Sequence, residues 1–407
     1  MHILFLTDNF PPEGNAPATR TYEHAREWVE LGHKVTVITC APNFPEGKVF
    51  DGFKNSFYSR SKMDGVDVVR VKTFISSNEG FVLRILDFMS FMFSSFFAGL
   101  FQKKVDVVVA TSPQFFTAVS GWAISACKRK KFVFELRDIW PASITAVGAM
   151  KDSFAIKLLE KLEMFLYRRS DLIVSVTNSF KEELIERGIN AEKISVVLNG
   201  VDLSKYQPIQ HKDAELSKNH HLQNKFVVGY IGTHGLAHAL EHVIVAAEKL
   251  KEYEDICFVF AGGGAAKGKL VELVSQKQLT NVVFIPRQPK EKMPAIWSLC
   301  DVSLISLRDT PLFKTVIPSK IFEAMGMGLP MLAAIPQGEA SHIIESASAG
   351  IICQPERADE LAKHVVEMFN SKDKMSHFKI CSLSAASNYD RKVLAVKMLD
   401  ELKSLVQ

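Results

Sequence analysis

Short runs of apolar and β-branched residues alternate with stretches of helical periodicity along the first half of the chain. The runs lie at residues 2–8, 34–40, 66–72, 105–111, 132–137, 171–177 and 194–198. Continuous apolar runs of this length are typical of strands buried on both faces in a parallel sheet. Between them, residues 19–31 have helical periodicity, and we expect that helix to stop at Gly32. The pattern predicts a doubly wound α/β domain over residues 1–200.

The alternation breaks in a polar stretch and then restarts. Residues 201–225 are polar and have no useful periodicity, so we expect them to be a linker. Strand-like runs follow at 226–231, 256–261, 282–285, 301–307, 330–335 and 350–353. This pattern indicates a second Rossmann-like domain over residues 226–385, and a carboxyl-terminal helix over 386–407 that we expect to return to the first domain. In two such domains, the crevice between them is the expected ligand site.

Composition narrows the class of protein. A length of 407 residues favours two domains, and 47% hydrophobic with 23% charged residues is typical of globular proteins. The net charge of +4 is small and spread out, which disfavours a nucleic-acid-binding stripe. Six cysteines stand far apart without zinc or C-x-x-C spacing, so we expect free, mostly buried thiols. With no signal-peptide pattern at the amino terminus, we expect a cytoplasmic protein.

Residues 81–101 form the most apolar segment. Arg84 and Asp87 leave about 14 uncharged residues there, fewer than the ~20 that a membrane-crossing helix needs. Two interpretations remain open: a long helix buried against a sheet, or a helix whose Phe/Met face dips into a membrane surface. Lys103, Lys104 and the KRKK run at 128–131 would support the second.

The segment PSKIFEAMGMGLP, residues 318–330, carries the strongest chemical signal. Pro318 and Ser319 favour a helix start, where free N–H groups and the positive end of the dipole attract phosphate. Lys320 adds a positive charge, and Glu323 one turn later can accept hydrogen bonds from a ribose diol. The alternative is that both are surface residues of an ordinary capped helix.

Two further loops of the second domain end a strand in glycines and lead into a helix. They are VVGYIGTHG at 227–235 and FVFAGGGAAKG at 258–268. Glycine permits close backbone approach to a ligand, and successive N–H groups can form an anion-binding nest. Each loop alone is a weak signal, but three phosphate-type loops in one domain favour a nucleotide diphosphate. An NAD enzyme is disfavoured because the first turn, NFPPEGNAPATR at 9–20, lacks G-x-G-x-x-G.

These features resemble the GT-B retaining glycosyltransferases of family 4, which use nucleotide-sugar donors. The resemblance is carried by PSKIFEAMGMGLP, by NGVD at 199–202 and by the order of two Rossmann-like halves, and it spans nearly the whole chain. ELRDIWP at 135–141, together with NFPPEGNAPATR, is most similar to enzymes of bacterial surface-polysaccharide assembly. Among these, the chain most resembles transferases of fucosamine (FucNAc, 2-acetamido-2,6-dideoxygalactose).

The resemblance implies roles for residues of the donor site. Glu323 corresponds to the second glutamate of an E-x7-E motif and would bind the ribose hydroxyls, while backbone amides of residues 318–320 would face the diphosphate. The first glutamate falls on Thr315, which offers a hydroxyl but no charge, so a 6-deoxy sugar with fewer polar contacts is expected. Gly14 and Asn15 occupy the place of a loop that closes over the donor in relatives. The complete set of expected donor-binding residues is Gly14, Asn15, Thr233, His234, Gly263, Arg287, Thr315, Ser319, Lys320 and Glu323.

Relatives also carry a basic pair after the first strand of the second domain, where this chain has Thr233 and His234. Lys320, Lys267 and Arg287 are the available substitutes. His234, His238 and His242 recur at helical spacing, which suggests a metal site, but the last two are more typical of the polar face of a helix with Leu236, Leu240, Val243 and Ala247 as its buried stripe. The resemblance implies no metal or other cofactor.

On the acceptor side, the expected catalytic residues are Arg137 and Asp138. Many relatives have a histidine where this chain has Arg137, whose pKa is too high for a general base, so Asp138 is the better candidate to position the acceptor hydroxyl. A structural Arg–Asp pair is the alternative. The expected reaction transfers a sugar from a UDP-sugar to a lipid-linked saccharide at the inner membrane, in O-antigen or capsule biosynthesis. A UDP-sugar epimerase or hydrolase and a non-catalytic two-domain binding protein are the competing interpretations.

Overall fold

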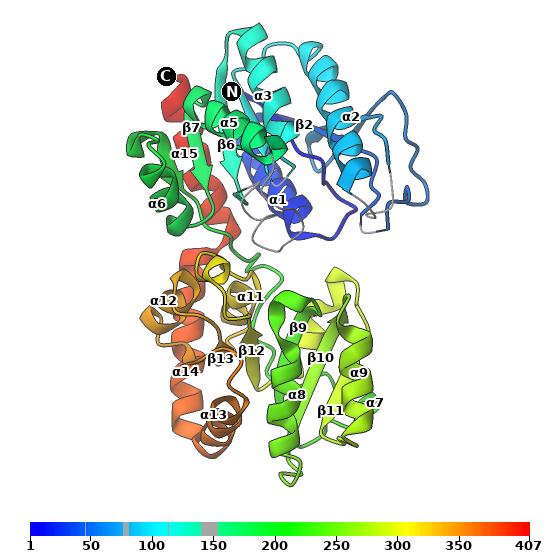
Figure 1. Ribbon diagram of the computed structural model, residues 1–407, viewed down its shortest axis with the longest axis vertical. Coiled ribbons are helices and arrows are strands. Elements are labelled where there is room, and N and C mark those ends of the chain that lie inside the picture. The colour runs from blue at the N-terminus through cyan, green and yellow to red at the C-terminus, as the bar shows by residue number, and fades with distance from the viewer. Residues whose placement is uncertain (45, 76–80, 113, 140–153) are drawn as a thin grey trace. The chain divides into compact units, whose positions relative to one another are not determined.

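The computed structural model describes residues 1–44, 46–75, 81–112, 114–139 and 154–407, and its chain divides into two compact units (Figure 1). Unit 1 comprises Met1–Leu198 together with Arg391–Gln407. Unit 2 comprises Asn199–Asp390. Each unit is built around its own parallel sheet with helices on both faces, which confirms the predicted α/β class.

The sheet of unit 1 has eight strands in the order β3-β4-β2-β1-β5-β6-β7-β8. All neighbours are parallel except β3 and β4, which form an antiparallel pair. The predicted apolar runs all became strands, whereas β3 was missed because its sequence YSRSKM is polar and almost fully exposed. The strands are β1 (His2–Leu6), β2 (Lys34–Cys40), β3 (Tyr58–Met63), β4 (Val66–Val71), β5 (Val107–Thr111), β6 (Lys131–Leu136), β7 (Leu172–Ser175) and β8 (Ile194–Val196).

Two hydrophobic clusters cover the two faces of this sheet. The described helices of unit 1 are α1 (Ala16–Glu30), α2 (Phe81–Leu100), α3 (Phe116–Lys128), α5 (Phe154–Arg169), α6 (Asn178–Glu186) and α15 (Arg391–Val406). Helix α15 packs on α1, and the indole Nε1 of Trp28 donates a 2.8 Å hydrogen bond to the carbonyl of Ala395. The predicted return of a carboxyl-terminal helix to the first domain is therefore confirmed.

Helix α1 starts three residues earlier than predicted. Asn15 is its N-cap, and Pro17 lies in the first turn rather than in the preceding loop. Proline is compatible with the first turn because the N–H that it lacks has no intrahelical partner there. The helix ends before Gly32, as predicted, and Gly32 has a φ of +83°.

The sheet of unit 2 has six parallel strands in the order β11-β10-β9-β12-β13-β14. All six predicted runs became strands: β9 (Phe226–Thr233), β10 (Ile256–Gly263), β11 (Val282–Ile285), β12 (Val302–Ser306), β13 (Met331–Ala334) and β14 (Gly350–Cys353). Its helices are α7 (Ala214–Asn219), α8 (Leu240–Lys249), α9 (Lys267–Gln276), α10 (Met293–Ser298), α11 (Lys320–Gly326), α12 (Glu339–Ser346), α13 (Ala358–Asn370) and α14 (Lys372–Ala386). Helix α7 lies within the stretch 201–225 that was expected to be a linker, and Asp213 caps it.

Helix α2 has one buried and one exposed face. Phe91, Ser95 and Ala98 are buried in unit 1, whereas the side chains of Phe93 and Phe97 are 54% and 58% exposed. By length and composition alone, Leu83–Leu100 is apolar enough to cross a membrane, and 22% of this window is buried. One face of the helix therefore packs against the core of unit 1, and the other face is exposed.

Candidate functional site

The two glycine-rich loops singled out in the sequence meet at the carboxyl ends of the neighbouring strands β9 and β10. We call this place, residues 232–235 and 262–264, the glycine edge. Strands β9 and β10 are paired to their ends, with Gly232 opposite Gly262 and Thr233 opposite Gly263. A Cβ on Gly262 would lie 2.0 Å from the carbonyl oxygen of Gly232, and Gly262 has a φ of +141°. Only glycine fits this position. The backbone N–H of His234 then donates a 2.8 Å hydrogen bond to the Gly263 carbonyl, which joins the two loops.

His234 lies inside this edge rather than on it. Its side chain is 0% exposed, and neither ring nitrogen has a hydrogen-bond partner within the described ranges. Its ring is close to those of Tyr230, Phe260 and Phe284. Burial lowers the pKa of His234 to about 4, and nearby Lys267 and Lys320 lower it further, so the ring is neutral at physiological pH. The loop after β9 therefore contributes no positive charge.

Lys320 is a basic side chain that lies beside this loop. It is the first residue of α11 and is only 8% exposed, and its Nζ has no hydrogen-bond partner in the described part of the chain. The Nζ lies 3.6 Å from the centroid of the Tyr230 ring, and a Cβ on Gly232 would be 3.3 Å from it. Burial lowers the pKa of Lys320 to about 7, although Glu323 acts in the opposite direction. Lys320 is thus a buried, unpartnered amine directly beside the glycine edge.

The other two candidate cations lie differently. Lys267, at the start of α9, donates a 3.1 Å hydrogen bond from Nζ to the carbonyl of Gly262. Arg287 follows β11 and is exposed. Of the three, Lys320 is the most deeply buried at the glycine edge.

The remaining predicted donor-binding residues of unit 2 occupy half-buried or exposed positions. Trp297 Nε1 donates a 3.2 Å hydrogen bond to a carboxylate oxygen of Glu323, which orients that side chain. Thr315 follows a short 3₁₀ turn and donates its hydroxyl to the carbonyl of Leu312 at 2.9 Å. Ser319 is the N-cap of α11 but makes no side-chain cap bond, and Pro318 precedes the cap instead of occupying the first turn. Thr233 is exposed at the end of β9.

The three histidines at helical spacing have separate environments. His238 lies in the 3₁₀ turn before α8, with its Nδ1 3.2 Å from the Ser306 carbonyl, whereas His242 on α8 lies 3.7 Å from a carboxylate oxygen of Glu356. Across the described ranges, no group of three His, Cys, Asp or Glu side chains is arranged to hold a metal ion. Leu236 was expected in the buried stripe of this helix, but it is 66% exposed because it precedes the helix.

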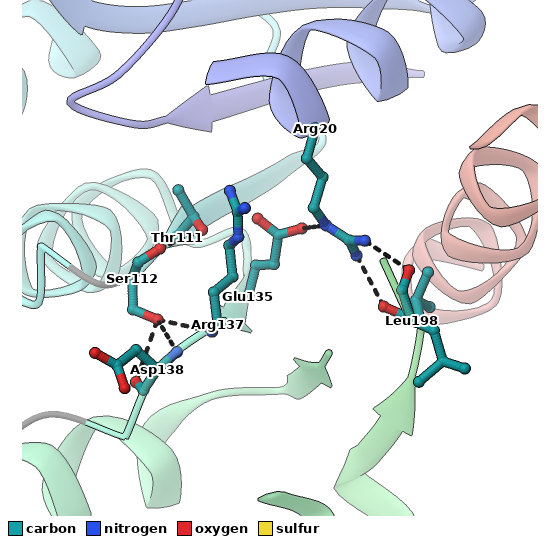
Figure 2. Close-up of polar contacts among 8 residues, drawn as sticks. Arg20, Thr111, Ser112, Glu135, Arg137, Asp138 and Leu198 are labelled. Carbon is teal, nitrogen blue, oxygen red and sulfur yellow. Dashed lines mark hydrogen bonds and ion pairs between the residues drawn. The ribbon is translucent and has the colours of Figure 1, made fainter. Parts of the chain in front are cut away.

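In unit 1, the residues expected to act on the acceptor lie just after β6. The backbone N–H groups of Arg137 and Asp138 both donate to the hydroxyl oxygen of Ser112, at 2.8 and 3.2 Å (Figure 2). This hydroxyl fixes the turn that follows the strand. Figure 2 shows the side chains of Arg137 and Asp138 pointing in different directions from it. Trp140 and Pro141 of the same motif lie outside the described residues.

A buried ion pair lies beside this turn. Arg20 of α1 places Nε 2.8 Å from a carboxylate oxygen of Glu135 on β6, and both side chains are buried. The same guanidinium donates to the carbonyls of Val197 and Leu198, at 2.9 and 2.7 Å (Figure 2). Burial raises the pKa of Glu135, but the charges of Arg20 and Arg137 outweigh that effect and lower it. Sequence reasoning missed this pair, although a glutamate inside the apolar run KFVFEL was a signal for it.

Arg137 is the cation of this edge that can face a ligand. Among the residues that the structure describes, none pairs with its buried Nη1, and burial lowers the pKa of Arg137 to about 10, so it stays charged at neutral pH. Asp8 follows β1, and burial raises its pKa, while hydrogen bonds from Asn9 and, more weakly, the charge of Arg137 oppose that shift. A second arginine, Arg391 of α15, is paired with Glu23 of α1. The edge can therefore hold a hydroxyl-bearing or anionic group.

The two predicted contacts of the first loop are also in unit 1. Asn15 accepts a 2.9 Å hydrogen bond from the N–H of Ala18 and donates one of 2.5 Å to Asn9, so its side chain already serves the helix cap and the loop. Gly14 is exposed, and a Cβ there would meet nothing within 4 Å. The predicted site residues thus form two groups. Gly14, Asn15, Arg137 and Asp138 belong to unit 1, and the other eight belong to unit 2.

Comparison with known proteins gives matches in both halves of the chain. Residues 17–205 match the domain family Glycosyltransferase Family 4, and residues 211–380 match Glycosyl transferases group 1. WcaI of Escherichia coli (strain K12), assigned as a glycosyl transferase of colanic acid biosynthesis, is 25% identical over 370 residues, which are 89% of this chain and 90% of WcaI.

Two solved structures extend the comparison to the fold. Sucrose-phosphate synthase from Thermosynechococcus elongatus superimposes with a TM-score of 0.77 at 13% identity, covering 99% of this chain and 98% of that one. Anabaena HepE, solved in complex with UDP and glucose, gives a TM-score of 0.74 at 18% identity, covering 99% of each chain. At such identities these structures share the fold.

Proposed function

Because the chain is a glycosyltransferase of GT-B fold, with a family 4 domain followed by a group 1 domain, we propose that it transfers a sugar from a UDP-sugar to a lipid-linked saccharide. The product would belong to a bacterial surface polysaccharide, such as an O-antigen or a capsule. The similarity to WcaI, which is assigned to colanic acid biosynthesis, supports this class of product.

One observation carries the proposal: the glycine edge of unit 2 holds a buried, unpartnered amine, with a carboxylate one helical turn later. The amine of Lys320 suits a diphosphate, and the Glu323 carboxylate, held by Trp297, suits the two ribose hydroxyls of a nucleotide. Gly232 and Gly262 let the backbone approach the ligand closely. HepE was solved with UDP on the same fold, which supports UDP as the nucleotide.

Replacing Glu323 by alanine tests this assignment. The ribose hydroxyls would donate hydrogen bonds to the Glu323 carboxylate, and one hydrogen bond to a charged group is worth about 1.5–3 kcal/mol, so UDP affinity should fall by at least roughly 10- to 100-fold. Titration calorimetry with UDP measures the effect. Glu345→Ala, an exposed carboxylate on α12, is the matched control and should bind UDP as the natural protein does. Unchanged UDP binding in Glu323→Ala would remove this residue from the ribose role.

The sugar is proposed to be a 2-acetamido-2,6-dideoxyhexose such as FucNAc. Thr315, which replaces an acidic residue of related enzymes, already donates its hydroxyl within its own turn, and this suits a sugar that lacks the 6-hydroxyl. A thermal-shift comparison of UDP-sugars tests the choice, because the preferred donor stabilises the protein most. A UDP-hexose with its 6-hydroxyl that stabilises more than UDP-FucNAc contradicts the assignment.

The stereochemistry is proposed to be retaining. In this scheme the acceptor hydroxyl attacks from the face that the diphosphate leaves, its oxygen bonds to the anomeric carbon, and its proton passes to the departing UDP phosphate. Asp138 positions the acceptor, and Lys320 stabilises the charge on the leaving group. The anomeric proton coupling of the product, measured by NMR, gives the configuration directly. An inverted product would rule out this scheme.

A lipid-linked acceptor requires contact with a membrane, and we assign that contact to the exposed face of α2 at the cytoplasmic surface. Its exposed apolar side chains are Leu83, Leu86, Phe93, Phe97, Leu100 and, just beyond the helix, Phe101. Lys128 Nζ donates to the carbonyls of Leu100 and Gln102, at 2.9 and 2.7 Å, which brings the basic run 128–131 to the end of this face. An apolar stripe beside clustered lysines suits anionic lipid. Docking rather than crossing is favoured because the opposite face of α2 belongs to the core.

Flotation with vesicles that contain anionic lipid tests the docking. The protein should float at low ionic strength, and Phe93→Ser combined with Phe97→Ser should reduce the floated fraction several-fold. Ile380→Ser, which removes an exposed apolar side chain from unit 2, should leave flotation unchanged. A natural protein that stays at the bottom of the gradient excludes this surface as a membrane contact.

The competing function within the same fold is that of a UDP-sugar epimerase or hydrolase. Such an enzyme turns over the nucleotide sugar without an acceptor, and NMR of the donor alone separates it from a transferase. UDP release that depends on the lipid-linked acceptor supports the proposed transfer.

A further inference from the structure

The charge state of the donor site depends on one buried group. A nucleotide diphosphate carries at least two negative charges, and the neutral His234 side chain supplies none of the opposite sign. Lys267 already donates to the Gly262 carbonyl. Lys320 is left as the buried amine at the glycine edge, without a hydrogen-bond partner among the described residues.

The surroundings of Lys320 stabilise its ammonium form only in part. The Tyr230 ring gives a cation–π contact at 3.6 Å, and Glu323 is the charged group acting on it electrostatically. The other titratable groups that face this position are His234 after β9 and His238 before α8. Both are neutral near pH 7, because burial lowers each pKa to about 4. An ammonium in this environment keeps N–H groups for which the described residues provide no acceptor.

We propose that binding of the donor diphosphate protonates Lys320, so that the nucleotide and one proton enter the site together. The inference rests on the proposed function and deepens it by specifying the charge of the site before and after binding. The diphosphate oxygens supply the missing hydrogen-bond acceptors and the negative charge, and both favour the ammonium form over the free amine. The glycine at position 232 leaves room for this contact, since a Cβ there would already be 3.3 Å from Nζ.

The pH range of the effect follows from the free protein. Burial lowers the pKa of Lys320 to about 7, so at pH 8 roughly 90% of the side chains are uncharged before binding. The terminal phosphate of UDP, with a pKa near ~6, is already ionised at pH 8 and takes up no proton. Binding at pH 8 should therefore take up roughly 0.9 proton per UDP, and UDP affinity should weaken about tenfold per pH unit between pH 8 and 9.

Titration calorimetry of the full-length protein with UDP at pH 8, in HEPES, Tris and Tricine, measures this uptake. The slope of the observed enthalpy against buffer ionisation enthalpy gives the number of protons. The natural protein should give a slope near 0.9. Lys320→Arg, which keeps a permanent charge, should give a slope near zero and an affinity that does not change from pH 8 to 9. Lys269→Met, an exposed lysine on α9, is the matched control and should retain the slope.

The outcomes separate this inference from the proposed function. UDP binding by the natural protein with a slope near zero overturns the proton coupling and leaves the transferase assignment standing. A slope that survives Lys320→Arg and disappears in Lys267→Met overturns the choice of residue. Absence of binding by any nucleotide removes the proposed function, and the inference with it. The slope of the natural protein decides the matter even where Lys320→Arg does not fold.

Discussion

Each of the two sheets ends in an edge with a buried cation, but the two edges treat that cation differently. In unit 1, Arg20 is paired with Glu135 at 2.8 Å and donates to two backbone carbonyls. In unit 2, Lys320 lies over the Tyr230 ring and near Glu323, and its amine has no hydrogen-bond partner among the residues that the structure describes. The first arrangement satisfies the charge within the protein. The arrangement in unit 2 leaves the Lys320 amine free to bind an acceptor on a ligand. Arg20 is therefore a structural cation, and Lys320 is a binding cation.

The largest loss of stability is expected when the paired arginine of unit 1 is replaced. Arg20→Met leaves the Glu135 carboxylate buried without its partner, so unit 1 should lose about 3–5 kcal/mol of stability. Hydrogen–deuterium exchange read by mass spectrometry reports the two units separately, and the loss should appear in peptides of unit 1. Arg60→Met is the control, because the Arg60–Asp67 pair is exposed and its loss should cost less than about 1 kcal/mol. Equal effects of the two substitutions would contradict the structural role of Arg20.

The next largest loss of stability is expected at the glycine edge of unit 2. Gly262→Ala places a methyl group 2.0 Å from the Gly232 carbonyl oxygen at a φ that alanine rarely adopts. We expect unit 2 to lose about 2–3 kcal/mol and UDP binding to weaken with it. Gly268→Ala, where a Cβ meets nothing within 4 Å, is the control. The measurement is the thermal midpoint with and without UDP, and an unaltered midpoint in Gly262→Ala refutes the steric account.

Replacing Lys320 should increase the stability of unit 2, whereas the two preceding substitutions decrease stability. Lys320→Met eliminates a charge that the fold disfavours, so unit 2 should gain about 1–3 kcal/mol at pH 6 while UDP affinity falls. The folded-state pKa of about 7 lies below the ordinary value of 10.5, so the cost of the charge is full below pH 7 and fades as the pH rises towards 10. Denaturation at pH 6 and at pH 9.5 checks the trend. Destabilisation at pH 6 would mean that the lysine stabilises the fold.

The smallest effect concerns Asp87 on α2. Burial, reinforced by Asp8, raises its pKa to about 7, so the folded protein resists ionising this carboxyl as the pH rises through 4 to 7. Asp87→Asn should therefore be neutral at pH 4 and stabilise unit 1 at pH 8 by about 1 kcal/mol, after allowance for partial solvent screening. Urea midpoints at the two pH values measure it. A stability gain of equal size at both pH values would attribute the effect to packing instead.

The sequence was sufficient to predict the architecture because strands buried on both faces leave a continuous apolar signal. The exception was β3, an exposed edge strand whose polar residues produce no such run. The early start of α1 was missed because Asn15 and Pro17 were read as loop residues, although a capping residue followed by proline is itself a helix-start signal.

The residue types of the candidate site could be predicted from the sequence. The burial and the neighbours of those residues could be predicted less well. The glycine loops and Lys320 stood out by composition. That Lys320 lies over Tyr230 and that His234 is buried depend on residues that only the folded sheet brings together. The same holds for Arg20 and Glu135, which are 115 positions apart in the chain. Long-range pairs of this kind leave no local pattern, so sequence reasoning identified Arg137 and overlooked the pair next to it.

The return of α15 to unit 1 also sets the order in which the protein can fold during synthesis. Trp28 and the cluster around it are covered by Leu394, Met398 and Leu402, which are translated after every residue of unit 2. On the ribosome, unit 2 can complete its core first. The apolar surface of α1 remains uncovered until α15 has been synthesised, hundreds of codons later. The half of the protein that is synthesised first therefore completes its core last, and the apolar face of α1 stays uncovered during that interval.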